Sequence, residues 1–146
     1  MPFVRTALAI LLLPMPLQAA PVELGKQFFH KDWAAACDNT LSCEAQSLIG
    51  DSQDESMPTV TVSRASDGAG PVQIGISLAE PKGDRYRLLV DGRLIESGTL
   101  AKGEYPVRLE GAAAMKLVRA MGRGRKLVVR GADNTVLGQL SLNGTA

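Results

Sequence analysis

The sequence is poor in the residues that most catalytic and metal sites need. Its 146 residues include one histidine, His30, and two cysteines, Cys37 and Cys43. A serine or cysteine triad would have to use this single histidine, and the Gly-x-Ser-x-Gly motif of many hydrolases is absent. A zinc site would have to combine His30 with the cysteines and Asp32 or Asp38, which is a poor ligand set. The sequence therefore predicts no triad and no metal, and it indicates no cofactor.

An excess of charge of one sign is also lacking. Sixteen basic and fifteen acidic residues leave a net charge of +1, which does not favour binding to nucleic acid. The distribution is uneven, because residues 23–80 hold nine acidic and three basic residues, whereas residues 81–146 hold six and twelve. This uneven distribution could give the protein a dipole that steers a ligand. Charges scattered over opposite solvated faces explain the distribution more simply.

Long apolar runs are absent except at the N-terminus. Residues 7–13 form an apolar run after Arg5 that is too short to span a bilayer, and Pro14 ends it. Ala19 is the expected cleavage point of a secretory signal peptide over residues 1–19. An uncleaved membrane anchor or a buried N-terminal helix is the alternative. No cysteine stands at the expected cleavage point, which excludes a bacterial lipoprotein.

Cleavage would leave residues 20–146, a length suited to a single domain with one hydrophobic core and no transmembrane segment. We expect this domain to be periplasmic or secreted. An oxidising compartment favours a disulfide between Cys37 and Cys43 over free thiols. Five residues separate the pair, unlike the two of a redox motif, so the disulfide is predicted to be structural. In the loop-entropy model a ring this short contributes about 2.4 kcal/mol.

Aromatic residues make up only 4% of the chain, and half of them fall within one short stretch that contains Phe28, Phe29 and Trp33. Trp33 is the sole tryptophan, and burial of such a large ring favours a packing role. A ligand contact through Trp33 and Phe29 is the alternative. The Asp-Asn-Thr sequence at residues 38–40 is typical of a turn, which predicts a strand, a tight loop and a strand around the disulfide.

Alternation of apolar and polar residues predicts most of the remaining structure as strands. The polar, acidic residues 50–58 predict a loop, and Asp91-Gly92 predicts a two-residue hairpin turn. Good helix formers predict one helix over residues 112–121, ended by Gly122. The predicted strands cover residues 59–63, 72–78, 86–90, 93–96, 106–109, 125–130 and 135–142. The expected fold class is mainly β, a β-rich α+β domain with antiparallel, sandwich-like sheets, one short helix and one disulfide.

One stretch carries a family resemblance. Asp32-Trp33 followed by Cys37-Asp38-Asn39-Thr40 and Cys43-Glu44-Ala45 resembles the exported bacterial proteins of domain-of-unknown-function family 1176. The similarity continues more weakly to Leu140–Gly144. Members of that family are about twice as long, which implies that this chain is a truncated or short form. A more distant similarity is to the invasion-associated locus B family. The resemblance implies an exported, disulfide-bonded, β-rich protein, and it adds no catalytic residue.

The basic cluster Gly122-Arg123-Gly124-Arg125-Lys126 is the main candidate for anion binding. Its glycines would let backbone N–H groups approach a phosphate, but the closing Lys-Ser/Thr of a phosphate-binding loop is missing. The positive charges also complement the dipole at the end of the predicted helix, and that interpretation is favoured. Contact of Arg123, Arg125 and Lys126 with an anionic polymer or a lipid headgroup is the alternative.

Three functional hypotheses follow. The first is a non-enzymatic binding module of the cell envelope, whose partner is a protein or envelope component rather than a small molecule. The second is a hydrolase that uses two carboxylates among Asp32, Asp38 and Glu44 on an envelope polymer, which would require a pair about 5 to 9.5 Å apart in a cleft. The third is an assembly or stability factor that pairs with another chain through an open sheet edge, for which an uncharged edge strand would be the sign. The sequence alone leaves open whether the protein is an enzyme.

Overall fold

The structure is a computed structural model that describes residues 25, 27–48, 57–64 and 70–145. The predicted signal peptide, residues 1–19, and nearly all of the predicted loop at residues 50–58 lie outside the described residues. Within the described part of the chain, no helix is long and apolar enough to cross a membrane.

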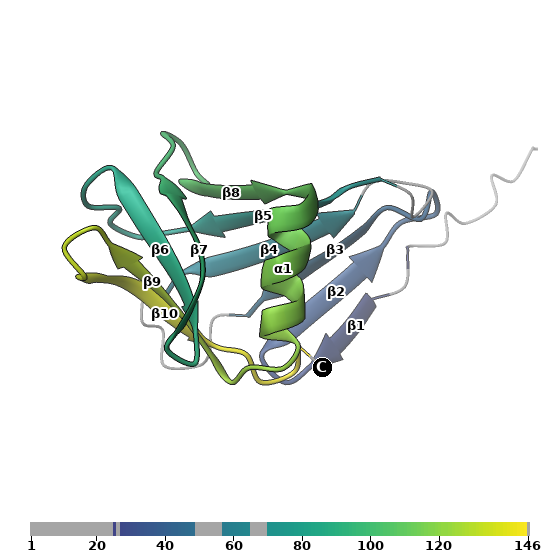
Figure 1. The fold of residues 1–146 in the computed structure, drawn as a ribbon. Coiled ribbons are helices and arrows are strands. Elements are labelled where there is room, and N and C mark those ends of the chain that lie inside the picture. Colours follow the sequence, from purple (N-terminus) through teal and green to yellow (C-terminus); the bar gives the residue numbers. More distant parts are fainter. Residues whose placement is uncertain (1–24, 26, 49–56, 65–69, 146) are drawn as a thin grey trace, which may run out of the picture.

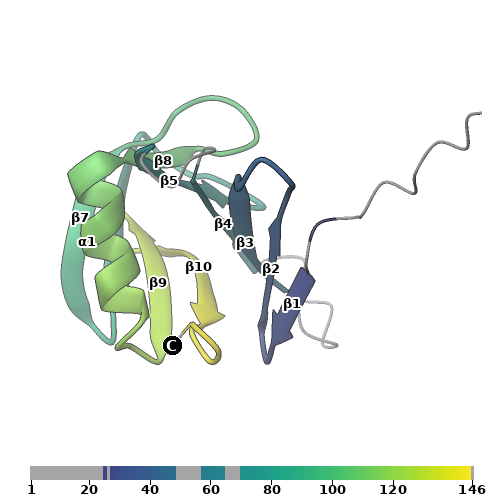
Figure 2. The ribbon, with the colours of Figure 1, turned by 90° about the vertical axis from the view of Figure 1, so that its right-hand side faces the viewer.

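Six antiparallel strands form the larger sheet, here called sheet A, in the order β1-β2-β3-β4-β5-β8. Their bounds are β1 (Gln27–His30), β2 (Trp33–Cys37), β3 (Cys43–Ser47), β4 (Thr59–Arg64), β5 (Val72–Ser77) and β8 (Val107–Glu110). The expected pairing of β4 with β5 is confirmed, with Val60 opposite Ile76 and Val62 opposite Ile74. Sheet A arches from β8, beside the helix, to β1 at the opposite side of the molecule (Figure 2).

Four antiparallel strands form the second sheet, sheet B, in the order β10-β9-β6-β7. These are β6 (Arg85–Val90), β7 (Arg93–Thr99), β9 (Lys126–Gly131) and β10 (Val136–Ser141). The predicted hairpin turn between β6 and β7 is confirmed, because Asp91 and Gly92 both have positive φ angles, of 47° and 81°. The sandwich-like arrangement of two antiparallel sheets is therefore present (Figure 1).

One helix, α1 (Gly111–Met121), follows β8 and contacts β5, β7 and β8. It lies in front of sheet A in Figure 1 and closes one side of the core. Its buried residues are Ala114, Leu117 and Met121, which recur at helical spacing. They join a single core with apolar side chains of both sheets, among them Val60, Ile76, Leu88, Val129 and Leu140.

Two features of the N-terminal region differ from the sequence-based expectation. The expected strand before the disulfide is a hairpin of two strands, β1 and β2, joined by a turn in which Lys31 has a positive φ of 52°. Phe29, a candidate core anchor, is 71% exposed, and Phe28 is 57% exposed. The reason is position: β1 is the edge strand of sheet A, and Phe29 and Phe28 alternate to opposite faces of it, neither of them in the buried core.

Candidate functional site

The structure places the sequence-derived candidates at separate positions. Trp33, at the start of β2, is 6% exposed and belongs to the core. It also lines a cavity together with residues of β1, α1 and the C-terminal turn. Arg123 lines a depression beside β7 and α1, and Arg125 and Lys126 line a groove along β10. The tryptophan and the basic residues therefore do not share one pocket.

The disulfide fastens the tip of the β2–β3 hairpin. Cys37 and Cys43 lie directly opposite each other and are bonded, with an Sγ–Sγ distance of 2.04 Å. Beyond them, the Asp38 carboxylate accepts hydrogen bonds from the Thr40 backbone N–H, the Thr40 hydroxyl and the Ser42 backbone N–H at 2.7 to 2.9 Å. The Thr40 hydroxyl, followed by the Ser42 N–H, lowers the pKa of Asp38. This tip is structural, since its polar groups bond to one another.

The backbone N–H groups of the basic cluster are used within the protein. Those of Gly122, Arg123 and Gly124 donate to carbonyl oxygens of the last turns of α1. The next two, on Arg125 and Lys126, donate to the carboxylate of Asp91 at 3.0 to 3.2 Å. A carboxylate of the same chain thus occupies the position that a phosphate would take in a phosphate-binding loop. An external anion would have to be held by side chains.

Two acids of the hydrolase hypothesis lie far apart, and the third lines a depression that includes neither of them. Asp32 and Asp38 flank opposite ends of β2, which at about 3.3 Å per residue places their backbones roughly 20 Å apart. Glu44 lines a depression on the outer face of sheet A with Tyr105 and Arg108, and the lining of that depression includes neither aspartate. Among the described residues, no three His, Cys, Asp or Glu side chains gather in a group that could hold a metal ion.

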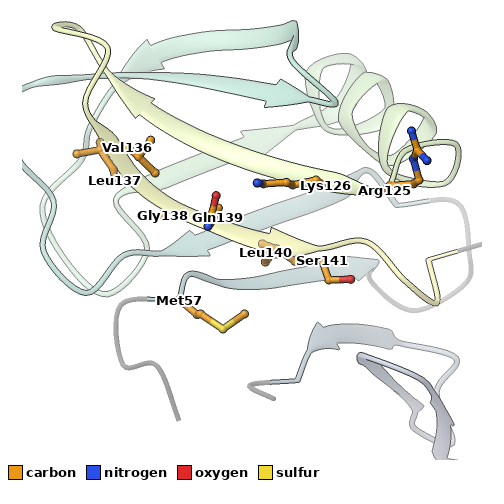
Figure 3. Close-up of a pocket in the computed structure, with 9 residues that line it drawn as sticks. All are labelled: Met57, Arg125, Lys126, Val136, Leu137, Gly138, Gln139, Leu140 and Ser141. Carbon is orange, nitrogen blue, oxygen red and sulfur yellow. The ribbon is translucent and has the colours of Figure 1, made fainter. Parts of the chain in front are cut away.

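A groove of about 610 Å³ runs along β10 (Figure 3). Its floor is β10 itself, Met57 stands on one side, and Arg125 and Lys126 lie at the end near Ser141. In Figure 3 the Lys126 side chain extends toward Gln139, and Arg125 points elsewhere. We call this feature the β10 groove.

The register of β10 shows which of its backbone groups face the groove. Leu142 N–H donates to Arg125 carbonyl oxygen, and the same pairing register continues through Leu140 opposite Leu127. Because hydrogen-bonded and non-hydrogen-bonded pairs alternate in an antiparallel ladder, the N–H and C=O of Gln139 and Ser141 point away from β9. No strand within the described residues pairs with that edge of sheet B.

The composition of β10 does not protect this edge from pairing. The strand reads Val-Leu-Gly-Gln-Leu-Ser and carries no charge, whereas the edge strands β7 and β8 both contain charged residues. Gly138 allows the chain at Pro58 to pass close by, because a Cβ there would lie 2.9 Å from Pro58 Cδ. The sequence showed the uncharged strand, but only the sheet order places it at an edge.

Comparison with known proteins gives one match. A family model described as "Protein of unknown function (DUF1176)" matches residues 27–146, which covers all the strands and the helix described above. No curated protein and no solved structure matches the chain.

Proposed function

The chain belongs to the DUF1176 family of proteins of unknown function, and we propose that it is a non-enzymatic interaction module that binds an extended segment of another polypeptide in the β10 groove. The observation that carries this proposal is the open, uncharged edge of β10. Each outward-facing residue of an edge strand offers one donor and one acceptor, and an added strand satisfies both. Gln139 and Ser141 offer two such pairs beside a groove.

The four sheet edges are not equivalent as docking sites. The edges formed by β7 and β8 carry charges, which oppose strand addition. The β1 edge is uncharged, but β1 has only four residues, all of them exposed. The six residues of β10 provide a longer edge, and the adjacent groove offers space for alternate side chains of a bound strand.

The charges at the groove indicate the chemistry of the partner segment. Lys126 lies directly opposite Ser141 on the neighbouring strand and lines the groove, as does Arg125. A bound strand with an acidic side chain near Ser141 would complement this end. The proposed occupant is therefore an extended segment of alternating apolar and polar residues with one acid at that end.

A pair of variants at Gln139 tests the docking mode. Gln139→Pro removes the backbone N–H that points away from β9 and leaves the hydrogen bonds between Leu140 and β9 in place. Gln139→Thr keeps that N–H and is the matched control. Synthetic peptides of alternating valine and threonine with a terminal glutamate would be titrated into ¹⁵N-labelled protein. We expect saturable shifts of the Gln139 and Ser141 amides in the wild type and in Gln139→Thr, and a loss of binding of at least tenfold in Gln139→Pro.

Equal binding by the two variants, or amide shifts confined to residues outside β10, would contradict this docking mode. Should Gln139→Pro fail to fold, Gln139→Lys serves instead, because a charge on an edge strand opposes strand addition. Replacing the peptide's glutamate by glutamine should weaken binding to the wild type more than to Lys126→Gln. That difference reports the contact with Lys126 separately from the backbone pairing.

We also propose that the module works outside the cytoplasm, in the periplasm or after secretion. The apolar run at residues 7–13 and the Cys37–Cys43 disulfide support this location, because such bonds persist in oxidising compartments. Fractionation of expressing cells should find the protein, shortened by residues 1–19, outside the cytoplasm. Recovery of the full-length chain from the cytoplasm with free thiols would reject this location.

A further inference from the structure

A depression of about 440 Å³ is bordered by the β6–β7 hairpin and by the C-terminal half of α1. Strand β7 and α1 are in contact and lie side by side in Figure 2. We call this feature the β7–α1 depression. It does not share a lining residue with the β10 groove. Its basic lining residues are Arg93, Lys116, Arg119 and Arg123.

The fold, not the sequence, brings these four basic residues together. Lys116, Arg119 and Arg123 are spaced three and four residues apart, which places them on one side of α1 and the turn that follows it. The Arg123 backbone N–H still donates to a carbonyl oxygen of the helix. Arg93 comes from the opposite wall, at the start of β7. The basic cluster at residues 122–126 is thereby divided, because Arg123 is its only cation in this lining.

The acids of the protein leave most of this positive charge uncompensated. Lys116 forms a salt bridge with Glu96 at 3.6 Å. Within the described part of the chain, no salt bridge involves Arg93, Arg119 or Arg123, and all three are exposed. Like charges gathered at one place repel one another, so an anion placed among them would relieve the repulsion.

One acid also lines the depression, but it does not pair with the arginines. The Asp91 carboxylate accepts hydrogen bonds from two backbone N–H groups at the start of β9, at 3.0 to 3.2 Å. It forms no salt bridge with any cation among the described residues. The arginine side chains therefore remain available to an external anion.

The dipole of α1 accounts for only part of this gathering of charge. A helix C-terminus attracts cations within its last turn, and Arg119 lies there. Lys116 lies before that turn, and Arg93 belongs to a strand. The buried apolar side chains of Val90 and Ile95 complete the lining between them. A concave site with charges of one sign and low-dielectric walls concentrates the electric field on a counter-ion.

We propose that the β7–α1 depression binds the phosphate groups of a compact ligand that carries two or more negative charges. The planar guanidinium group matches phosphate oxygens with two parallel N–H···O bonds, and here arginines supply such groups from both walls. Strand binding at β10 uses other residues, so either proposal can fail while the other stands.

Titration of pyrophosphate into the ¹⁵N-labelled full-length chain tests this site directly. The ionic strength is held constant, because salt screens exposed charges. We expect saturable shifts of the Leu94, Arg119 and Arg123 amide signals. Malonate, a small dicarboxylate, should bind at least fivefold more weakly, because each of its charged groups offers fewer acceptor oxygens than a phosphate.

Exposed arginines inside and outside the depression provide matched variants. Arg93→Gln and Arg123→Gln should each weaken pyrophosphate binding at least fivefold. Arg85→Gln removes an exposed arginine at the end of β6 farthest from the depression and should change the affinity less than twofold. The proposal is overturned if pyrophosphate gives no saturable shift of these amides, if malonate binds as tightly, or if Arg85→Gln weakens binding as much as Arg123→Gln. Should Arg123→Gln not fold, Arg119→Gln replaces it.

Vesicles distinguish a lipid headgroup from a soluble ligand as the source of the phosphate. The full-length chain would be sedimented with phosphatidylcholine vesicles that contain phosphatidic acid, and with phosphatidylcholine alone as the control. Sedimentation that needs phosphatidic acid, is reversed by pyrophosphate and is reduced in Arg93→Gln identifies a headgroup. Saturable binding of pyrophosphate without sedimentation identifies a soluble ligand. Sedimentation that Arg93→Gln and Arg123→Gln leave unchanged would contradict the proposed site.

Discussion

The carboxylate of Asp91 accepts a hydrogen bond from the backbone N–H of Lys126 at 3.0 Å, and the Asp91 N–H donates to the Lys126 carbonyl oxygen at the same distance. The side chain also accepts from the Arg125 N–H at 3.1 Å. The turn between β6 and β7 is thereby joined to the first residues of β9. One aspartate both forms the hairpin turn and anchors a strand that begins 35 residues later in the chain.

Removing the Asp91 carboxylate should destabilise the fold. We expect Asp91→Ala to lower the free energy of unfolding by about 2 to 3 kcal/mol, because two backbone donors lose a charged acceptor and alanine tolerates a positive φ poorly. Asp91→Asn keeps an oxygen acceptor and tolerates that conformation, so it should lose about half as much. Urea unfolding measures both, and an Asp91→Ala protein as stable as the wild type would show that these bonds contribute nothing.

Gly124 is predicted to be required for packing. A Cβ at this position would lie 2.2 Å from Val90 Cγ1 and 3.2 Å from Leu142 Cδ1. Gly124→Ala should therefore lower stability by about 1 to 3 kcal/mol, as overpacking does elsewhere. The matched control is Gly122→Ala, whose Cβ would meet its nearest atom at 3.6 Å and should be tolerated. Combining Gly124→Ala with Val90→Ala should recover part of the loss in thermal unfolding, and equal effects at both glycines would contradict the packing role.

The Asp38 carboxylate, next to the disulfide, should make the free energy of unfolding depend on pH in the acidic range. Hydrogen bonds from Thr40 and then Ser42 lower the pKa of Asp38 below its ordinary value of 3.8. A depressed pKa in the folded state gives stability that is present above the unfolded value and is lost as the pH falls through the folded value. The stability difference between wild type and Asp38→Asn should therefore shrink from pH 6 toward pH 3 in urea unfolding. A difference that stays constant with pH would show that ionisation of Asp38 is not involved.

Local chemistry made most of the secondary structure predictable. Alternation of apolar and polar residues predicted the strands from Thr59 onward, and Asp91-Gly92 predicted its turn, because such signals act over a few residues. The disulfide followed from having only two cysteines. The helix was predicted within one residue at its start, because good helix formers act locally.

Pairings between distant strands were decided only by the tertiary structure. Neither the placement of β8 beside β5 nor that of β9 beside β6 follows from a local pattern, because crossover connections depend on which sheet faces bury the most apolar surface. The partners of the backbone N–H groups in the glycine-rich basic cluster were decided by the tertiary structure for the same reason. Asp91, more than thirty residues away in sequence, supplies the acceptor for its N–H groups.

The sequence by itself determined the fold class, the disulfide, the hairpin turn and the scarcity of catalytic groups, since each depends on composition or on short-range conformational preference. The tertiary structure alone decided that the uncharged β10 is an edge strand among the described residues, that Phe29 is exposed and that Trp33 is buried beside a cavity. Edge position and cavity volume depend on which strands meet and which side chains fill the space between them, and that is a property of the packed chain as a whole.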